Sequence, residues 1–243
     1  MMVVRSALRK VMVFLISFPY KAVRSFRQSE PSGVSDVNTN PRSNPCAPSS
    51  NDATNEATRL QALRDRLHAI GDGEVWVFGY GSLLWDPGFE YEERRPALLH
   101  GYHRSFCVYS EYYRGTAERP GLVLGLDRGG SCRGAAYRLH RESASAILDY
   151  LWAREMIYNV YEPRIVQVRV ADRQVQSRTF VANRWHKQYA GRLSMTEKSR
   201  LIRQGVGVGG ANTAYLANTL SHLAALGVDD GALQRLRAMV ECA

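Results

Sequence analysis

The fold of this chain is decided by one stretch, Val75-Trp76-Val77-Phe78-Gly79-Tyr80-Gly81-Ser82-Leu83. Its first four residues are two valines and two aromatic residues, a composition typical of a short buried strand. The two glycines let the backbone turn sharply and bring its amide groups close to a ligand. A Gly-x-Gly turn after a strand has two interpretations, a packing turn or a site for a carboxylate or an oxyanion.

Helical and extended segments flank this stretch without regular alternation. We expect helices over 59–70, 142–158, 213–226 and 231–240, and strands over 105–109, 122–126, 134–139, 165–170 and 176–181. Asn212 is expected to cap the third helix and Gly227 to end it. A doubly wound parallel sheet needs strands and helices in alternation. The sequence therefore predicts an α+β fold, a small and mainly antiparallel mixed sheet or barrel flanked by helices.

Three regions of the chain differ in composition. Residues 1–30 carry six Lys and Arg against one Glu, around an apolar run over 11–20. This run is too short to span a bilayer comfortably, so residues 1–30 are either a targeting or membrane-surface leader or a dispensable extension. Residues 31–58 are rich in Ser, Asn, Pro and Thr, which predicts a disordered linker. A single functional domain is expected over 59–243.

The overall composition is that of a globular protein with a sizeable core, 45% hydrophobic and 23% charged in 243 residues. The net charge is +9, but Lys and Arg do not form a stripe interleaved with aromatic residues. We therefore expect no nucleic-acid partner and favour a mildly basic pocket for an acidic small molecule. Membrane contact is expected only through residues 1–30.

Metal and cofactor sites are not expected from the motifs. The four cysteines lie far apart and the six histidines show no metal-ligand spacing, which favours reduced thiols in a cytoplasmic protein. The glycine-rich run over 205–210 lacks the strand and helix context of a dinucleotide site. We interpret it as a flexible connection that brings the helix after Asn212 against the site.

One carboxylate falls on the apolar face of the helix predicted over 142–158. Glu155 follows Leu148 by seven residues and Leu151 by four, which is helical spacing. Burial disfavours the charged form of a carboxyl group and raises its pKa, so a buried Glu can act as a general base near neutral pH. The alternative is an architectural ion pair with Arg154 or another arginine.

Six segments resemble, in the same order, the motifs of ChaC-type gamma-glutamylcyclotransferases. The first is the stretch 77–85 with Asp86-Pro87-Gly88-Phe89 after it. The others are Gly101-Tyr102-His103-Arg104, Arg114-Gly115-Thr116 with Pro120-Gly121, Cys132-Arg133-Gly134-Ala135-Ala136-Tyr137, Tyr150-Leu151-Trp152-Ala153-Arg154-Glu155, and Gly209-Gly210-Ala211-Asn212 with Tyr215-Leu216. The resemblance covers residues 75–240 and leaves out the leader and the linker.

The resemblance implies a glutathione-specific gamma-glutamylcyclotransferase, a lyase without a cofactor. In this reaction the α-amino group of glutathione attacks its own gamma carbonyl, which releases 5-oxoproline and cysteinylglycine. The resemblance assigns the general base to Glu155. It assigns substrate binding to Val77, Phe78, Gly79, Tyr80, Gly81, Ser82, Leu83 and Tyr215, with Arg104 or Arg114 as a further contact.

The sequence departs from the family pattern directly after Glu155. Many relatives continue with Lys and a Gly-Gly-Tyr turn, whereas this chain continues with Met156-Ile157-Tyr158. This segment is expected near the substrate. Other gamma-glutamyl amines or dipeptides are therefore alternative substrates, and a non-catalytic module that binds gamma-glutamyl ligands is an alternative function.

Overall fold

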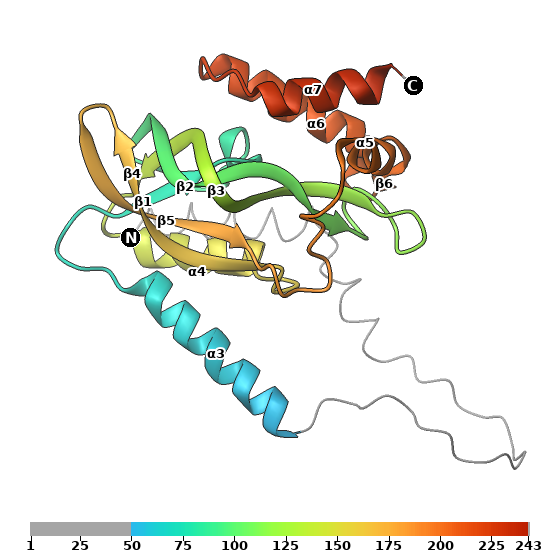
Figure 1. Cartoon of the computed structure of the whole chain (residues 1–243). Coiled ribbons are helices and arrows are strands. Elements are labelled where there is room, and N and C mark those ends of the chain that lie inside the picture. Colours follow the sequence, from blue (N-terminus) through green and yellow to red (C-terminus); the bar gives the residue numbers. More distant parts are fainter. Residues whose placement is uncertain (1–49, 243) are drawn as a thin grey trace, which may run out of the picture. The chain divides into compact units, whose positions relative to one another are not determined.

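The computed structural model describes residues 50–242 (Figure 1). The chain divides after Ala62 into two compact units, and the second contains the whole sheet. The leader expected over 1–30 and most of the linker expected over 31–58 lie outside the described residues. Helix α3 spans Ser50–His68, so it begins inside the stretch expected to be a linker. Among residues 50–242, no helix is long and apolar enough to cross a membrane.

Five strands form a closed barrel in the order β1-β3-β2-β4-β5, which confirms the expected α+β architecture. Neighbouring strands are antiparallel except β1 and β5, which run parallel and close the barrel. The strands are β1 Trp76–Gly79, β2 Glu93–Ser110, β3 Gly121–Arg138, β4 Tyr161–Val170 and β5 Arg173–Ala182.

Strands β2 and β3 form one long hairpin, where the sequence predicts three short strands. The pairing continues across two register shifts, between His100 and Tyr102 and between Phe106 and Val108. Gly101 lies in the first shift with a φ of +85°, a conformation that glycine adopts without strain. Glycines that look like strand ends in the sequence are therefore bulges within continuous strands.

The β2–β3 and β4–β5 hairpins separate at one end of the barrel. Strands β2 and β4 pair only between Ala97–Leu99 and Val168–Val170, so their other halves share no ladder. The segment after β5 adds to the exposed edge of β2 in this opening. The amide of Ala190 donates to the carbonyl of Cys107, and the amide of Tyr109 donates to the carbonyl of Gln188, both at 2.8 Å.

The helices of the second unit lie on two sides of the barrel (Figure 1). Helix α4 lies on one side, and α5, α6 and α7 pack together on the other. Their bounds are α4 Ala144–Glu155, α5 Met195–Gln204, α6 Asn212–Ala225 and α7 Gly231–Glu241. Helix α5 is not among the predicted elements, although Ser194 and Glu197 form a capping box at its start.

The glycine-rich run, which we interpret from the sequence as a flexible connection, forms a small hairpin. Strand β6 (Val206–Gly207) pairs with β7 (Gly210–Ala211). The hairpin is bonded to the loop after β2, because the amides of Val208 and Gly209 donate to the carbonyls of Tyr112 and Tyr113, at 3.0 and 2.9 Å. It leads directly into α6, as the sequence analysis expects.

Asn212 does not cap α6, and the prediction that it does is wrong. Ala211 is the N-cap residue, and Asn212 is fully buried in the first turn. Its side-chain oxygen accepts from the amide of Leu122 and its side-chain nitrogen donates to the carbonyl of Leu122, both at 2.7 Å. The side chain therefore ties α6 to β3. Gly227 ends the helix as predicted, with a φ of +67°.

Replacement of Asn212 by Ala is expected to lower the free energy of unfolding by about 2–4 kcal/mol, because two buried backbone groups of Leu122 lose their partners. Urea denaturation monitored by circular dichroism measures this change. Asn218→Ala is the matched control, since Asn218 is exposed on the same helix. Equal stability of the two variants would contradict the bridging role of Asn212.

Candidate active site

A tight loop follows β1 at its carboxyl end. The loop turns at Gly79 and Gly81 into a 3-10 helix, η1, over Ser82–Leu84. A Cβ atom at Gly79 would lie 2.9 Å from the Cβ of Leu83, so the loop can fold back only over a glycine. Within the part of the chain that the structure describes, no acceptor takes the amide hydrogens of Gly81 and Ser82. Both amides are therefore available as donors to a ligand.

The residues on either side of this turn hold it in place from within the core. Val77 and Phe78 are 0% and 1% exposed, so their side chains belong to the interior. The carbonyl of Phe78 accepts from the Thr179 hydroxyl at 3.0 Å, and the carbonyl of Leu83 accepts from the Tyr137 hydroxyl at 2.7 Å. These flanking residues hold the loop in place. Tyr80, Gly81 and Ser82 form its central part.

Glu155 is the last residue of α4 and lies on its apolar side, as the helical spacing predicts. Leu148 and Leu151 of the same face are fully buried, and Met156 directly after the helix is also buried. The Glu155 side chain is 17% exposed. Desolvation raises the pKa of this carboxyl group above its usual value, although Arg154 acts in the opposite direction. The group therefore retains a higher proton affinity than an ordinary glutamate.

Arg154 joins this carboxylate to the loop. Its Nε lies 3.3 Å from Oε1 of Glu155, so the ion pair considered in the sequence analysis is present. The same guanidinium donates to the Ser82 hydroxyl at 3.0 Å, to the carbonyl of Asp86 at 2.8 Å and to the Tyr150 hydroxyl at 3.0 Å. Arg154 thus fixes the end of α4 against the loop after β1, a positioning role that its place beside Glu155 in the sequence only suggests.

Three tyrosines surround the carboxylate. Burial raises the pKa of Tyr80, Tyr161 and Tyr215, and the negative charge of Glu155 adds to the increase for each. The pKa of Tyr215 is raised to about 12. All three phenols therefore stay neutral and can donate hydrogen bonds near neutral pH. Tyr161 is not among the predicted site residues, because nothing in its local sequence sets it apart from other strand residues.

Gly81 and Arg114 adjoin Tyr215. A Cβ atom at Gly81 would lie 3.6 Å from the Tyr215 hydroxyl, without a clash. The Arg114 guanidinium lies over the Tyr215 ring, 5.1 Å from its centroid. The loop after β1, the start of α6 and the loop after β2 therefore meet at one place.

Arg104 lies beneath the loop, with its guanidinium bonded to protein groups. Its side chain is 2% exposed and pairs with Asp230 at 2.8 Å. It donates through Nε to the carbonyl of Tyr80 at 2.6 Å and through Nη2 to the carbonyl of Arg133 at 2.5 Å. Any effect of Arg104 on a ligand is therefore expected to pass through the loop that it supports.

The arrangement suits proton transfer beside a loop whose amides can serve as donors. Among the described side chains, no group of three or more His, Cys, Asp or Glu could hold a metal ion. A carboxylate of raised pKa, neutral phenols and loop amides can together remove a proton from a nucleophile and stabilise a developing oxyanion.

Comparison with known proteins gives consistent matches. Residues 75–243 match the family model described as ChaC-like protein. The chain is 38% identical over 171 residues to a glutathione-specific gamma-glutamylcyclotransferase of Escherichia coli, an alignment that covers 70% of this chain and 74% of the relative. A protein of the same name from Schizosaccharomyces pombe is 32% identical over 177 residues, which covers 63% of this chain and 85% of the relative.

The fold also matches a solved structure. The crystal structure of a yeast gamma-glutamyl cyclotransferase specific to glutathione aligns with a TM-score of 0.65 and 24% sequence identity. The alignment covers 70% of this chain and 97% of the yeast chain. At this identity the likeness establishes the fold that the two chains share.

Replacement of Glu155 by Gln is expected to stabilise the protein at pH 8. The pKa of Glu155 is higher in the folded state than in the unfolded state, where it is about 4.3. The folded protein therefore loses stability as the pH rises from the unfolded pKa through the folded pKa, because the buried group must ionise. The gain should therefore be largest above the folded pKa and should disappear at about pH 4. Thermal unfolding at both pH values measures it.

The control for this stability experiment is Glu142→Gln, which changes an exposed carboxylate just before α4. It should not reproduce the pH-dependent gain. A Glu155→Gln variant that is less stable than wild type at pH 8 would show that the ion pair with Arg154 outweighs desolvation.

Proposed function

The chain belongs to the ChaC-like protein family, and we propose that it is a glutathione-specific gamma-glutamylcyclotransferase. The reaction is a lyase reaction that converts glutathione to 5-oxoproline and cysteinylglycine. The observation that carries this proposal is Glu155, a desolvated carboxylate of raised pKa that Arg154 holds beside the loop 79–82. The relatives of the same activity support it.

Glu155 removes a proton from the substrate. The α-amino group of glutathione is an ammonium ion at neutral pH and has no lone pair with which to attack. The carboxylate of Glu155 accepts one of its protons, and the raised pKa makes that transfer more favourable than for an ordinary glutamate. The amine nitrogen then bonds to the gamma-carbonyl carbon and closes the five-membered ring. The bond from that carbon to the cysteine nitrogen breaks as Glu155 returns its proton to that nitrogen, and the ring nitrogen releases its second proton to solvent as the lactam forms.

The loop after β1 receives the charge that forms on the carbonyl oxygen. The amides of Gly81 and Ser82 have no protein acceptor among the described residues, so they can donate to an oxyanion or to the α-carboxylate of the glutamyl group. Tyr80 and Tyr215 add neutral hydroxyl donors around the same space, whereas the Tyr161 hydroxyl already donates to the carbonyl of Leu124. Because nucleophile and carbonyl belong to one molecule, holding the glutamyl chain in a bent conformation supplies much of the acceleration.

The leaving dipeptide has a candidate place beside the segment that departs from the family pattern. Tyr158 follows α4 and lies near Tyr112 and Tyr113 of the loop after β2, where burial and the neighbouring phenols together raise the pKa of Tyr113 and of Tyr158. The rings of Tyr112 and Tyr113 lie 5.2 Å apart. We assign cysteinylglycine to this aromatic surface, which uses Tyr158 in place of the Gly-Gly-Tyr turn of many relatives.

Purified protein should release 5-oxoproline from glutathione, and Glu155→Gln should lower kcat by about 100- to 10,000-fold, the usual contribution of a general base. Chromatographic measurement of 5-oxoproline and cysteinylglycine gives the rates. Glu142→Gln, which changes an exposed carboxylate near the same helix, should retain wild-type turnover.

Three outcomes would contradict this assignment in different ways. Full turnover by Glu155→Gln would mean that another group is the base. Binding of glutathione by the wild type without release of 5-oxoproline would favour a ligand-binding module. A higher kcat/KM for another gamma-glutamyl dipeptide or amine would keep the reaction and change the substrate.

Replacement of Gly81 by Ala should raise the KM for glutathione by about tenfold or more while the protein stays folded. The added methyl group would meet only ordinary contacts, with the Tyr215 hydroxyl at 3.6 Å, but it would occupy space above the loop amides. Steady-state kinetics and a thermal unfolding curve separate the two effects. A variant with wild-type KM would show that the substrate does not approach this part of the loop.

A further inference from the structure

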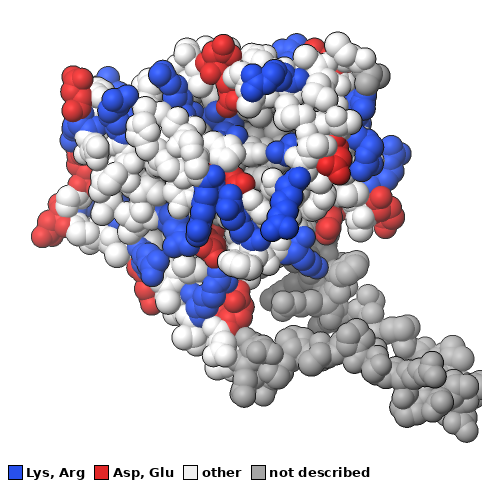
Figure 2. All heavy atoms as spheres, viewed as in Figure 1, with Lys and Arg blue, Asp and Glu red and all other residues white. Residues whose placement is uncertain are grey.

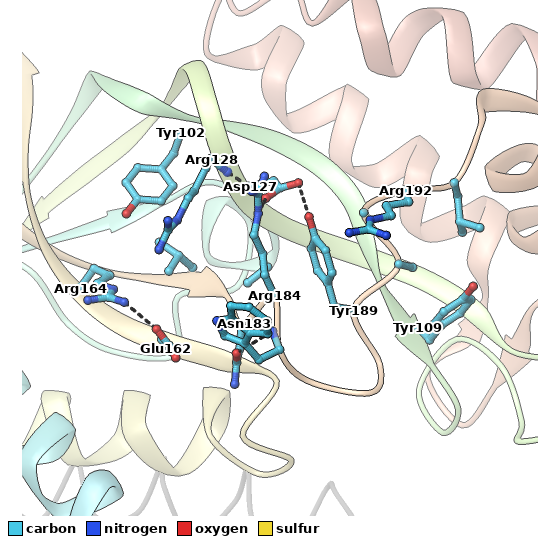
Figure 3. Close-up of a pocket in the computed structure, with 16 residues that line it drawn as sticks. Tyr102, Tyr109, Asp127, Arg128, Glu162, Arg164, Asn183, Arg184, Tyr189 and Arg192 are labelled. Atoms are coloured by element: carbon cyan, nitrogen blue, oxygen red, sulfur yellow. Dashed lines mark hydrogen bonds and ion pairs between the residues drawn. The ribbon is translucent and has the colours of Figure 1, made fainter.

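A cavity lies in the opening between the β2–β3 and β4–β5 hairpins, and Glu155 is not among its lining residues. Its volume is about 820 Å³, within the range of small-molecule sites. It exists because β2 and β4 pair over only a few residues and then separate, and because the segment 183–193 crosses the gap. Strands β2, β3, β4 and β5 and this segment all contribute to its walls (Figure 3).

The cavity and the active site use opposite faces of the same strand. On β4 the Tyr161 hydroxyl donates to the carbonyl of Leu124 at 2.7 Å, and Tyr161 lies near Glu155. The next residue, Glu162, lines the cavity. Neither Glu155 nor any residue of the loop 79–83 lines the cavity. A ligand in this cavity would therefore not contact the reacting groups.

Both acidic side chains of the cavity already have cationic partners. Asp127 accepts from Nε of Arg184 at 2.6 Å and from the Tyr189 hydroxyl at 2.7 Å (Figure 3). Although burial opposes it, these hydrogen bonds hold the pKa of Asp127 below its usual value. Glu162 pairs with Nη2 of Arg164 at 2.7 Å. The two carboxylates thus neutralise the charge of two of the four arginines that line the cavity.

The remaining positive charge is available to a ligand. Arg128 and Arg192 are exposed at the cavity, and across residues 53–242 neither has an ion pair or a side-chain hydrogen bond. Arg164 keeps a buried Nε without a hydrogen-bond partner. A charged donor without an acceptor carries a desolvation cost, which an incoming anion would relieve. Figure 2 shows Lys and Arg side chains gathered near the middle of the face where β5 ends in Figure 1.

Aromatic side chains accompany these arginines. Tyr102 is the cross-strand partner of Arg128 in the β2–β3 ladder, so the two side chains start from adjacent backbone positions. In Figure 3 they lie on the same side of the cavity as Arg164, whereas Arg192 lies beyond Tyr189. Trp185 lines the cavity as well and is 94% exposed, which is exceptional for a side chain of its size. Exposed aromatic faces can stack on a planar ring.

We propose that this cavity binds a phosphorylated small molecule with a planar ring, the chemistry of a nucleoside phosphate. Arginines are suited to phosphate because the guanidinium donates two parallel hydrogen bonds, and Arg128 of β3 and Arg164 of β4 lie on one side of the cavity while Arg192 supplies positive charge further along it. The neutralised carboxylates do not repel the phosphate. The ring stacks on Trp185 or Tyr102. The proposal is independent of glutathione turnover.

The test is isothermal titration of the full chain with ADP, inorganic pyrophosphate and adenosine. ADP should bind saturably and more tightly than either fragment. The double variant Arg128→Gln/Arg192→Gln should weaken ADP binding by about tenfold or more. Trp185→Ala should weaken ADP binding and leave pyrophosphate binding unchanged.

The matched control is Arg200→Gln/Arg203→Gln, which removes two exposed arginines from α5 and lowers the net charge equally. It should retain wild-type affinity for ADP. Equal loss of affinity in both double variants, or no saturable binding of ADP or pyrophosphate, would overturn the site. Equal affinity for ADP and pyrophosphate together with no effect of Trp185→Ala would overturn the nucleoside part of the proposal.

Discussion

The candidate active site depends on the contacts of one side chain, Arg154. Its guanidinium joins the last turn of α4 to the loop after β1, through Ser82 and the carbonyl of Asp86, and it lies 3.3 Å from Glu155. A single cation therefore sets both the position of the carboxylate and part of its electrostatic environment. Because desolvation outweighs the attraction of Arg154, the pKa of Glu155 remains raised. Without the arginine, the carboxylate would lose its partner and the loop would lose its link to the helix.

A second arginine supports the same loop from below. Arg104 donates to the carbonyl of Tyr80 and pairs with Asp230, which also caps α7 by accepting from the amide of Leu233 at 3.2 Å. The buried charge of Arg104 is thus neutralised by a helix that lies on the other side of the barrel from α4. Two helices from opposite sides therefore fix one loop, one through Arg154 and one through Arg104. This explains how a turn with two glycines can present its amides in a defined direction.

The sequence predicts the parts of this site that depend on local pattern. The strand and turn over 75–83 follow from apolar residues and glycines, and Glu155 follows from the helical spacing of Leu148 and Leu151. The roles of Tyr161 and Asn212 do not follow, because barrel closure decides which strand face points inward and because the partner of Asn212 is 90 residues away. The length of strands β2 and β3 could not be predicted either, because a bulge at Gly101 has the same local sequence pattern as the end of a strand.

The short strand β1 explains why a carboxylate can be kept desolvated at this site. All four of its residues are buried, and it pairs with β3 on one side and with β5 on the other, so it closes the barrel. The loop at its carboxyl end therefore starts from a fixed point, reinforced by the hydrogen bond from Thr179 to the carbonyl of Phe78. A desolvated Glu155 reduces stability at neutral pH, and the core around β1 offsets that cost. The stability of the barrel thus compensates for the desolvation that raises the pKa of Glu155.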